Sequence, residues 1–194
     1  MAATASSKPL SYAFSYGFVG GPLHARKFKR LMNHASFVYT LLPQKADIII
    51  AHSAGCWLVP EDCRPKLLIY VGMPLAQMSP RQSLLKANAA ALKNNDLGRT
   101  LITKTKTTYY GLRQPRRNLA IVRMSKTARP VVLPKVSSIF IANKHDPWPK
   151  DKALDEYVKN HNWSFINLPG THDDVWEHPD RYVEIINHYA RILA

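Results

Sequence analysis

Cysteine is scarce: the 194 residues include only Cys56 and Cys63. Two cysteines in a chain of this length predict neither a disulfide framework nor a cysteine metal site. We therefore expect the protein to work in the reducing cytoplasm. Cys56 is an alternative nucleophile, but its place about one turn into a helix after Ser53 favours packing instead.

Long apolar runs are also missing. No stretch approaches the roughly 20 apolar residues that a membrane-spanning helix needs, and runs such as 48–51 have the length of a strand. Residues 1–7 are small and polar, without the basic and apolar segments of a secretory signal. The sequence therefore predicts a soluble protein without a membrane span, and a disordered lead-in at 1–7.

Acidic residues are few, since 13 Asp and Glu are set against 27 Lys and Arg, for a formal net charge of +14. The imbalance lies mainly in residues 79–135, which carry 13 basic residues and one acid, Asp96. Such a segment predicts attraction of anionic substrates or partners, or simply a solvated basic surface. Nucleic acid is disfavoured because no recognised motif or regular aromatic platform accompanies the arginines, which include Arg113, Arg116, Arg117 and Arg123.

The chain does contain a series of short apolar, β-branched runs bounded by turn residues. The intervals between them have helical character, which argues for a parallel sheet. Length and an apolar content of 46% allow one sizeable core, so we expect a single α/β domain over 1–194. The predicted strands are 10–16, 47–52, 66–71, 136–142 and 163–168, while 36–42 is either a sixth strand or part of a helix.

Helix signals occupy the remaining intervals. Residues 79–82 combine an N-cap serine, a proline at the first helical position and a capping-box glutamine, which predicts a helix near 80–95. Prolines also precede a predicted helix at 151–160, and Pro179 opens the last one. That last helix has an apolar face formed by Tyr182, Ile185, Ile186, Tyr189 and Ile192.

The clearest chemical motif is the run 46–55, an apolar strand that ends in small-x-Ser-x-Gly around Ser53. A serine on a tight strand-to-helix turn exposes its hydroxyl, and small residues at Ala51 and Gly55 let neighbouring backbone approach. The amides after the serine lie at a helix start, where they can stabilise an oxyanion. The pattern predicts that Ser53 is a nucleophile, although the motif alone is common by chance.

An acid and a base follow two later strands. Asp146 lies in a turn after 136–142, and His172 follows a glycine turn after 163–168. In the predicted mechanism His172 takes the proton of Ser53, and Asp146 orients the imidazole. The alternatives are an ordinary turn serine, a helix-capping aspartate and a surface histidine.

Residues 172–178 gather two imidazoles and three carboxylates. Zinc motifs place paired histidines about three or four residues apart on a helix face, whereas these are six apart across a predicted loop. We therefore predict no metal and no cofactor. We expect Asp173 and Asp174 to cap a turn or to position the histidine loop.

Taken in this order, the motifs resemble those of the α/β-hydrolase superfamily of serine hydrolases, from the first predicted strand to the last helix. The resemblance implies a compact α/β-hydrolase fold: a mostly parallel sheet of five or six strands, helices on both faces, and a small basic cap inserted at about 74–135. Residues 10–22 look like the family's early strand and glycine-rich oxyanion loop, with Tyr16 where histidine is usual. By the same resemblance, the backbone N–H groups of Phe18 and Ala54 form the oxyanion hole.

The function implied is that of an esterase, lipase or thioesterase. Its substrate would be a small-molecule ester or thioester, anionic or carrier-linked in some versions, cleaved without a cofactor. Two alternatives stay open: a hydrolase-fold binding protein whose basic cap binds an acidic partner or RNA, and hydrolysis of amides or peptides. Side chains expected to line the substrate site, with core packing as the alternative, are Trp148, Trp176, Tyr109 and Tyr110.

Overall fold

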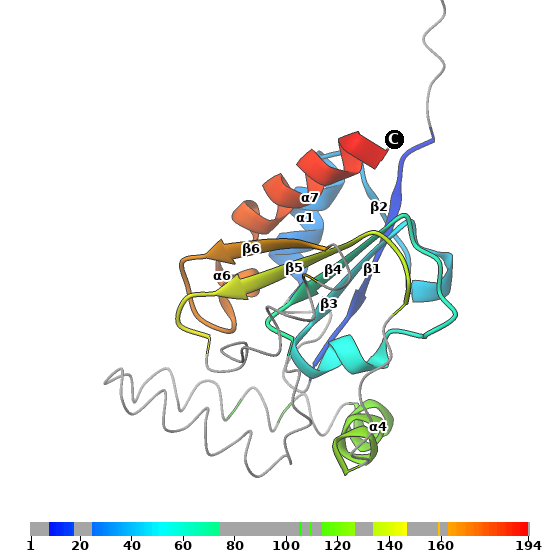
Figure 1. Ribbon diagram of the computed structural model, residues 1–194, viewed down its shortest axis with the longest axis vertical. Helices are drawn as coiled ribbons and strands as arrows, with labels where there is room; N and C mark the ends of the chain where they lie inside the picture. The colour runs from blue at the N-terminus through cyan, green and yellow to red at the C-terminus, as the bar shows by residue number, and fades with distance from the viewer. Residues whose placement is uncertain are drawn as a thin grey trace, which may run out of the picture.

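The structure is a computed structural model that describes residues 8–17, 25–73, 105, 109, 114–126, 134–146, 159 and 163–193. Its described strands form one six-stranded sheet in the order β2-β1-β3-β4-β5-β6, and every pair is parallel (Figure 1). The strands are β1 (Ser11–Ser15), β2 (Val38–Tyr39), β3 (Ile48–His52), β4 (Leu67–Val71), β5 (Ser138–Asn143) and β6 (Ser164–Leu168).

Two central strands show why the sequence specifies this sheet. Every residue of β3 and β4 is buried, because a parallel sheet is covered on both faces and its inner strands are apolar throughout. The five strands predicted from apolar runs are confirmed, with ends shifted by one or two residues.

Residues 36–42, which the sequence left undecided, contain the edge strand β2. Helix α1 (Arg26–His34) ends just before it, and Ser36 reverses the chain with φ of +66°. Val38 and Tyr39 then pair with Ser11 and Tyr12 of β1.

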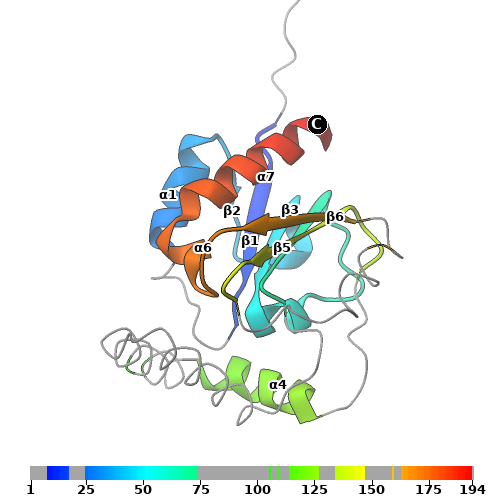
Figure 2. The same ribbon diagram turned by 60° about the vertical axis from the view of Figure 1, so that its left-hand side comes forward.

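Helices cover both faces of the sheet. On one face, α1 and α7 (Pro179–Leu193) lie side by side, and the short α6 (Asp174–Glu177) directly precedes α7 (Figure 2). On the other face lie the 3-10 helix η2 (Ser53–Leu58) and α4 (Pro115–Lys126), where Ile121 packs in one cluster with Trp57. A further 3-10 turn, η1 (Pro43–Lys45), leads into β3.

The last helix begins at Pro179 as predicted. One residue of its predicted apolar face, Ile192, is exposed, unlike the others. Tyr182 and Ile186 are buried, whereas Ile192 is 67% exposed. Ile192 instead borders a hollow of about 550 Å³ that also contacts Leu67 and Ser138 at the amino ends of β4 and β5. Within the described residues no helix or strand fills that hollow. The apolar face of α7 therefore extends to Ile192, beyond the part of the helix that packs against the core.

Several predictions fall outside the described residues. These are the lead-in at 1–7, the helices at 80–95 and 151–160 apart from Lys159, and most of the cap at 74–135. Within that cap the structure describes α4 with its flanking Gln114, the isolated residues Thr105 and Tyr109, and Pro134 and Lys135. In the described part of the chain, no helix is long and apolar enough to cross a membrane.

Candidate active site

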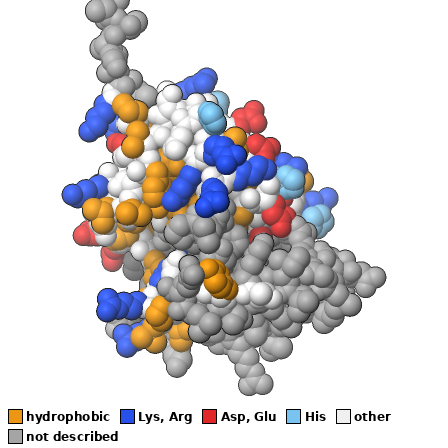
Figure 3. All heavy atoms as spheres, turned by 180° about the vertical axis from the view of Figure 1, so that it is seen from behind, with side chains coloured by type: hydrophobic (Ala, Val, Ile, Leu, Met, Phe, Trp, Pro, Cys, Tyr) orange, Lys and Arg blue, Asp and Glu red, His pale blue; other side chains and the backbone are white. Residues whose placement is uncertain are grey.

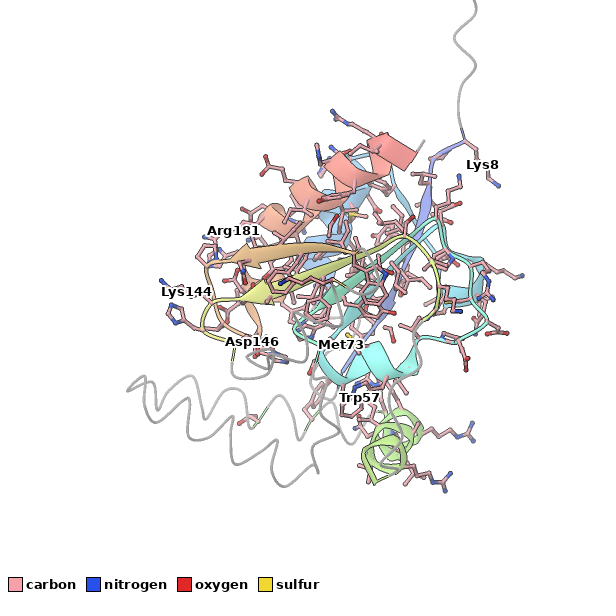
Figure 4. The ribbon with its side chains drawn as sticks, viewed as in Figure 1. Lys8, Trp57, Met73, Lys144, Asp146 and Arg181 are labelled. Atoms are coloured by element: carbon pink, nitrogen blue, oxygen red, sulfur yellow. The ribbon has the colours of Figure 1, made fainter. Side chains whose placement is uncertain are left out.

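The three predicted catalytic residues follow the carboxyl ends of three strands. Ser53 comes after β3, Asp146 after β5 and His172 after β6. Because all these strands are parallel, their carboxyl ends meet at one edge of the sheet, where α/β proteins bind their ligands. Figure 4 shows Asp146 and Trp57 along this edge.

Ser53 lies in a sharp turn with an unusual backbone conformation. Its φ is +55°, a left-handed value that residues other than glycine rarely adopt. Gly17 lies so close that a Cβ there would be 2.9 Å from Cβ of Ser53, and a Cβ on Gly55 would overlap the backbone of Ser15. The Ser15 hydroxyl also donates a hydrogen bond of 2.7 Å to the Gly55 carbonyl. The end of β1 is therefore pressed against the serine turn.

The helix predicted at this point of the sequence is the short 3-10 helix η2, which begins at Ser53 itself. Cys56 is buried there, and its thiol donates to the Ala51 carbonyl at 3.4 Å. Burial raises the pKa of the Cys56 thiol far above its usual range. Cys56 packs in the core cluster that contains Trp57, as predicted.

His172 and Asp146 form a hydrogen-bonded pair. His172 Nδ1 lies 2.8 Å from Asp146 Oδ2, and the Asp146 side chain is fully buried. Where Asp146 accepts this bond as a carboxylate, the proton of the neutral imidazole lies on Nδ1, and Nε2 is then the ring nitrogen with a lone pair for a base. Burial acts to lower the pKa of His172, but the charge of Asp146, its hydrogen bond and the charge of Asp173 together raise it.

Hydrogen bonds fix the two loops that carry this pair. Asn143 Nδ2 donates to the Thr171 carbonyl at 2.7 Å, and the His145 amide donates to the Gly170 carbonyl at 2.9 Å. The Tyr182 hydroxyl, from α7, donates to Asn143 Oδ1 at 2.8 Å. These bonds tie the turn after β5 to the histidine loop, so the Asp146–His172 geometry is held by the surrounding protein.

Gly72, directly after β4, lies behind the pair. Its φ is +56°, and a Cβ there would lie 2.5 Å from Asp146 Oδ2 and 3.0 Å from His172 Nδ1. Only a residue without a side chain leaves room for the hydrogen bond between them.

His52 is a contributor that the sequence reasoning missed. Its Nε2 donates to the His172 carbonyl at 2.9 Å, and the two rings lie 4.7 Å apart. Burial, together with the charge of His172, lowers the pKa of His52 to about 4. His52 thus stays neutral. Because it directly precedes Ser53, its hydrogen bond links the end of β3 to the loop that carries His172. The available signal was a polar side chain in a wholly apolar strand, which needs a buried partner.

No family model and no curated protein matches the sequence, but solved structures match the fold. Potato (Solanum tuberosum) epoxide hydrolase I matches with a TM-score of 0.57 at 12% identity, over 94% of this chain and 93% of that one. The peroxisomal α/β-hydrolase Lpx1 of Saccharomyces cerevisiae matches with 0.59 at 11%, over 96% and 77%. The thioesterase domain from the curacin biosynthetic pathway matches with 0.52 at 10%, over 94% and 92%. The chain has the α/β-hydrolase fold.

The remaining predicted site residues are those expected to form the oxyanion hole or to line the substrate site, and the structure describes three of them. Ala54 is buried directly after Ser53, and Trp176 packs in the core with its ring 5.2 Å from that of His52. Tyr109 is 42% exposed. Their roles in oxyanion or substrate binding stay predictions, and so do those of three residues outside the described part, Phe18, Tyr110 and Trp148.

Asp174 has a role in the loop that carries the histidine. Its carboxylate accepts a hydrogen bond from Arg181 at 3.3 Å and packs against Gly170. Asp174, Glu177 and His178 each offer one side-chain atom that could bind a metal ion, and these three atoms lie within 4.8 Å of one another. Those two side chains are exposed, and the buried carboxylate is already paired with a cation, so the contacts of Asp174 support its expected part in positioning the loop.

Proposed function

We propose that the protein is a serine hydrolase that cleaves carboxylic esters or thioesters through Ser53, His172 and Asp146. The observation that carries this proposal is the 2.8 Å bond between His172 and the buried Asp146, at the sheet edge where Ser53 lies in a left-handed turn. A nucleophile, a base and an acid that orients the base are the groups that acyl transfer through a serine uses.

In the proposed reaction, Ser53 Oγ attacks the carbonyl carbon while His172 Nε2 takes its proton. The negative charge passes to the carbonyl oxygen, which accepts hydrogen bonds from the backbone N–H groups of Ala54 and Phe18. Collapse of this intermediate breaks the bond to the alcohol or thiol, which leaves with the proton from His172. Water, deprotonated in turn by His172, then releases the acid from the acyl-enzyme.

Asp146 contributes by stabilising the imidazolium that forms on His172. Because that interaction raises the pKa of His172, the free base is the minor form in mildly acidic solution. The kcat/KM should therefore rise with pH as His172 loses its proton.

We further propose that residues 74–135 form a cap over this edge, in a cytoplasmic protein. The cap is supported by α4, whose Ile121 packs against η2. The cellular location is supported by the free thiols of Cys56 and Cys63.

A second candidate is a binding protein of the same fold, favoured by the 13 basic residues against one acid in residues 79–135. Such a protein would bind an acidic partner or RNA through the basic segment, with strong salt dependence. It would not react at Ser53, and the following experiment separates the two.

The test is hydrolysis of p-nitrophenyl esters and acyl thioesters of increasing chain length, with fluorophosphonate labelling. Ser53→Ala should abolish turnover and labelling. Ser36→Ala is the matched control, because Ser36 is the other described serine with positive φ and lies at the opposite edge of the sheet. Parallel assays of anilides test the amide alternative. A folded wild type that is neither labelled nor active on any of these compounds would overturn the proposal.

A further inference from the structure

Arg117, in the first turn of α4, has an unusual environment. All three nitrogens of its guanidinium are buried, and none has a hydrogen-bond partner within the described chain. None of the ion pairs between described residues includes it either. Its neighbours on the same helix, Arg116 and Arg123, are exposed instead. Arg117 is therefore distinct from the two exposed arginines of α4, and Figure 3 shows basic side chains in the lower part of that view.

A buried guanidinium without partners is energetically unfavourable. It presents five N–H donors and a full charge, and each needs an acceptor once water is removed. Burial lowers the pKa of Arg117, yet arginine stays protonated at any physiological pH. An arrangement that lowers stability in this way is typical of a site prepared for a ligand.

The nearest aromatic group does not neutralise this charge. The guanidinium carbon of Arg117 lies 6.0 Å from the ring centroid of Tyr16, a cation–π distance. Burial raises the pKa of Tyr16 far above its usual range, so the phenol remains neutral. Tyr16 supports the cation without supplying an anion.

The position of Arg117 relates it to the proposed nucleophile. Tyr16 follows β1 and precedes Gly17, which contacts the Ser53 turn. One turn along α4, Ile121 is fully buried against η2, the helix that begins at Ser53. The contact with Tyr16 and the packing of Ile121 thus place Arg117 near the carboxyl end of β1, and Figure 2 shows α4 as a whole beyond η2.

We propose that Arg117 binds a carboxylate or phosphate group of the substrate. The proposal that Arg117 binds part of the substrate rests on the proposed hydrolase function. The planar fork of a guanidinium matches both groups through paired N–H···O bonds. The preferred substrates are then esters or thioesters that carry an anionic group, and Arg117 selects them over neutral esters of the same length.

The test compares p-nitrophenyl pentanoate with the mono-p-nitrophenyl ester of glutaric acid, which has the same chain length but ends in a carboxylate. Arg117→Met keeps an unbranched apolar stem and removes the charged guanidinium, and Arg116→Met is the matched exposed control. We expect Arg117→Met to lower kcat/KM for the glutarate ester by roughly 10- to 100-fold, the effect of one charged hydrogen-bond site. The pentanoate ester should change by less than about 2-fold, and Arg116→Met should leave the preference intact.

Binding measured by calorimetry provides a readout independent of catalysis. Glutarate and inorganic phosphate, titrated separately, should bind the wild type and Arg116→Met but not Arg117→Met, and the stronger of the two identifies the anion. Since the variant removes an unpaired buried charge, its melting temperature should not fall. Arg117→Lys, which keeps the charge but loses the fork, should show intermediate binding.

The outcomes separate the two proposals. Equal anion binding by wild type and Arg117→Met, or an equal loss of activity on both esters, would overturn the role of Arg117. So would a drop in melting temperature with unchanged ester preference, since that indicates a structural role. If the anions bind through Arg117 but no ester is cleaved and Ser53 is not labelled, the anion site stands and the hydrolase function fails.

Discussion

At the scale of single residues, Gly72 decides whether the proposed acid and base can meet. An alanine there would place its Cβ 2.5 Å from Asp146 Oδ2, at a φ of +56° that alanine rarely adopts. We expect Gly72→Ala to lower kcat/KM by at least about 100-fold, because the hydrogen bond that orients His172 is displaced. Ester hydrolysis measures the effect.

The same substitution should lower the free energy of unfolding by about 1–2 kcal/mol from backbone strain. Thermal melting therefore accompanies the assay and shows whether the variant is folded. A folded Gly72→Ala protein with wild-type activity would mean that the Asp146–His172 pair does not set the rate.

His52 makes stability depend on pH. Its pKa is about 4 in the folded protein and near 6.5 when unfolded, so between these values the unfolded chain binds more protons. The contribution of neutral His52 is complete above pH 6.5 and is lost as pH falls towards 4. From pH 6.5 to 4.5 this loss amounts to about 2 kcal/mol. His172, with its raised pKa, changes stability in the opposite sense.

Comparison with His52→Gln isolates this effect. Glutamine keeps an N–H donor for the His172 carbonyl but does not titrate. Urea unfolding at pH 6.5 and 4.5 should show that the variant loses about 2 kcal/mol less than the wild type. Equal losses in the two proteins would show that His52 is not held neutral.

These residues also mark what the sequence could and could not reveal. The positions of Ser53, Asp146 and His172 at one sheet edge were predictable because each follows an apolar strand of a parallel sheet, while their catalytic roles stay a proposal. Gly72 and Arg117 were not predictable, because their roles depend on neighbours far away in the chain. For Arg117 the deciding fact is that its buried guanidinium has no hydrogen-bond partner among the described residues, which no local sequence pattern records.

At the scale of elements, the strands were predictable because inner parallel strands are continuous apolar runs. The two-residue strand β2 was not, since so short an edge strand is defined by its pairing with β1 rather than by its own pattern. Likewise the sequence placed a helix after Ser53 but not its 3-10 geometry. Local pattern identifies the presence of an element, and tertiary contacts set its form.

The docking of α4 rests on Ile121. This side chain is fully buried against the cluster that contains Trp57, whereas Leu119 on the same helix is 50% exposed. Ile121→Ala should lower the free energy of unfolding by about 2–4 kcal/mol, and Leu119→Ala by less than about 0.5 kcal/mol. Denaturant unfolding measures both. Similar values for the two variants would contradict the packing of α4 on η2.

At the scale of the whole molecule, charge is distributed unevenly. Residues 79–135 carry 13 basic residues and one acid, while the remaining residues carry 14 and 12, which leaves a net charge of only +2 outside the segment. A field concentrated in this way draws anions towards one part of the surface and is screened over about 10 Å at 0.1 M salt. Arg117 acts differently, because contact inside a buried site is screened much less.

Salt therefore separates the two kinds of attraction. Raising NaCl from about 20 to 300 mM should lower kcat/KM for the glutarate ester several-fold and leave that of the pentanoate ester nearly unchanged. Arg117→Met removes one charge from a net +14, so the relative decrease with salt should persist in that variant although its activity is lower. If the salt dependence disappears with Arg117, the long-range field of the basic segment contributes nothing to substrate capture, and a single contact accounts for the whole preference.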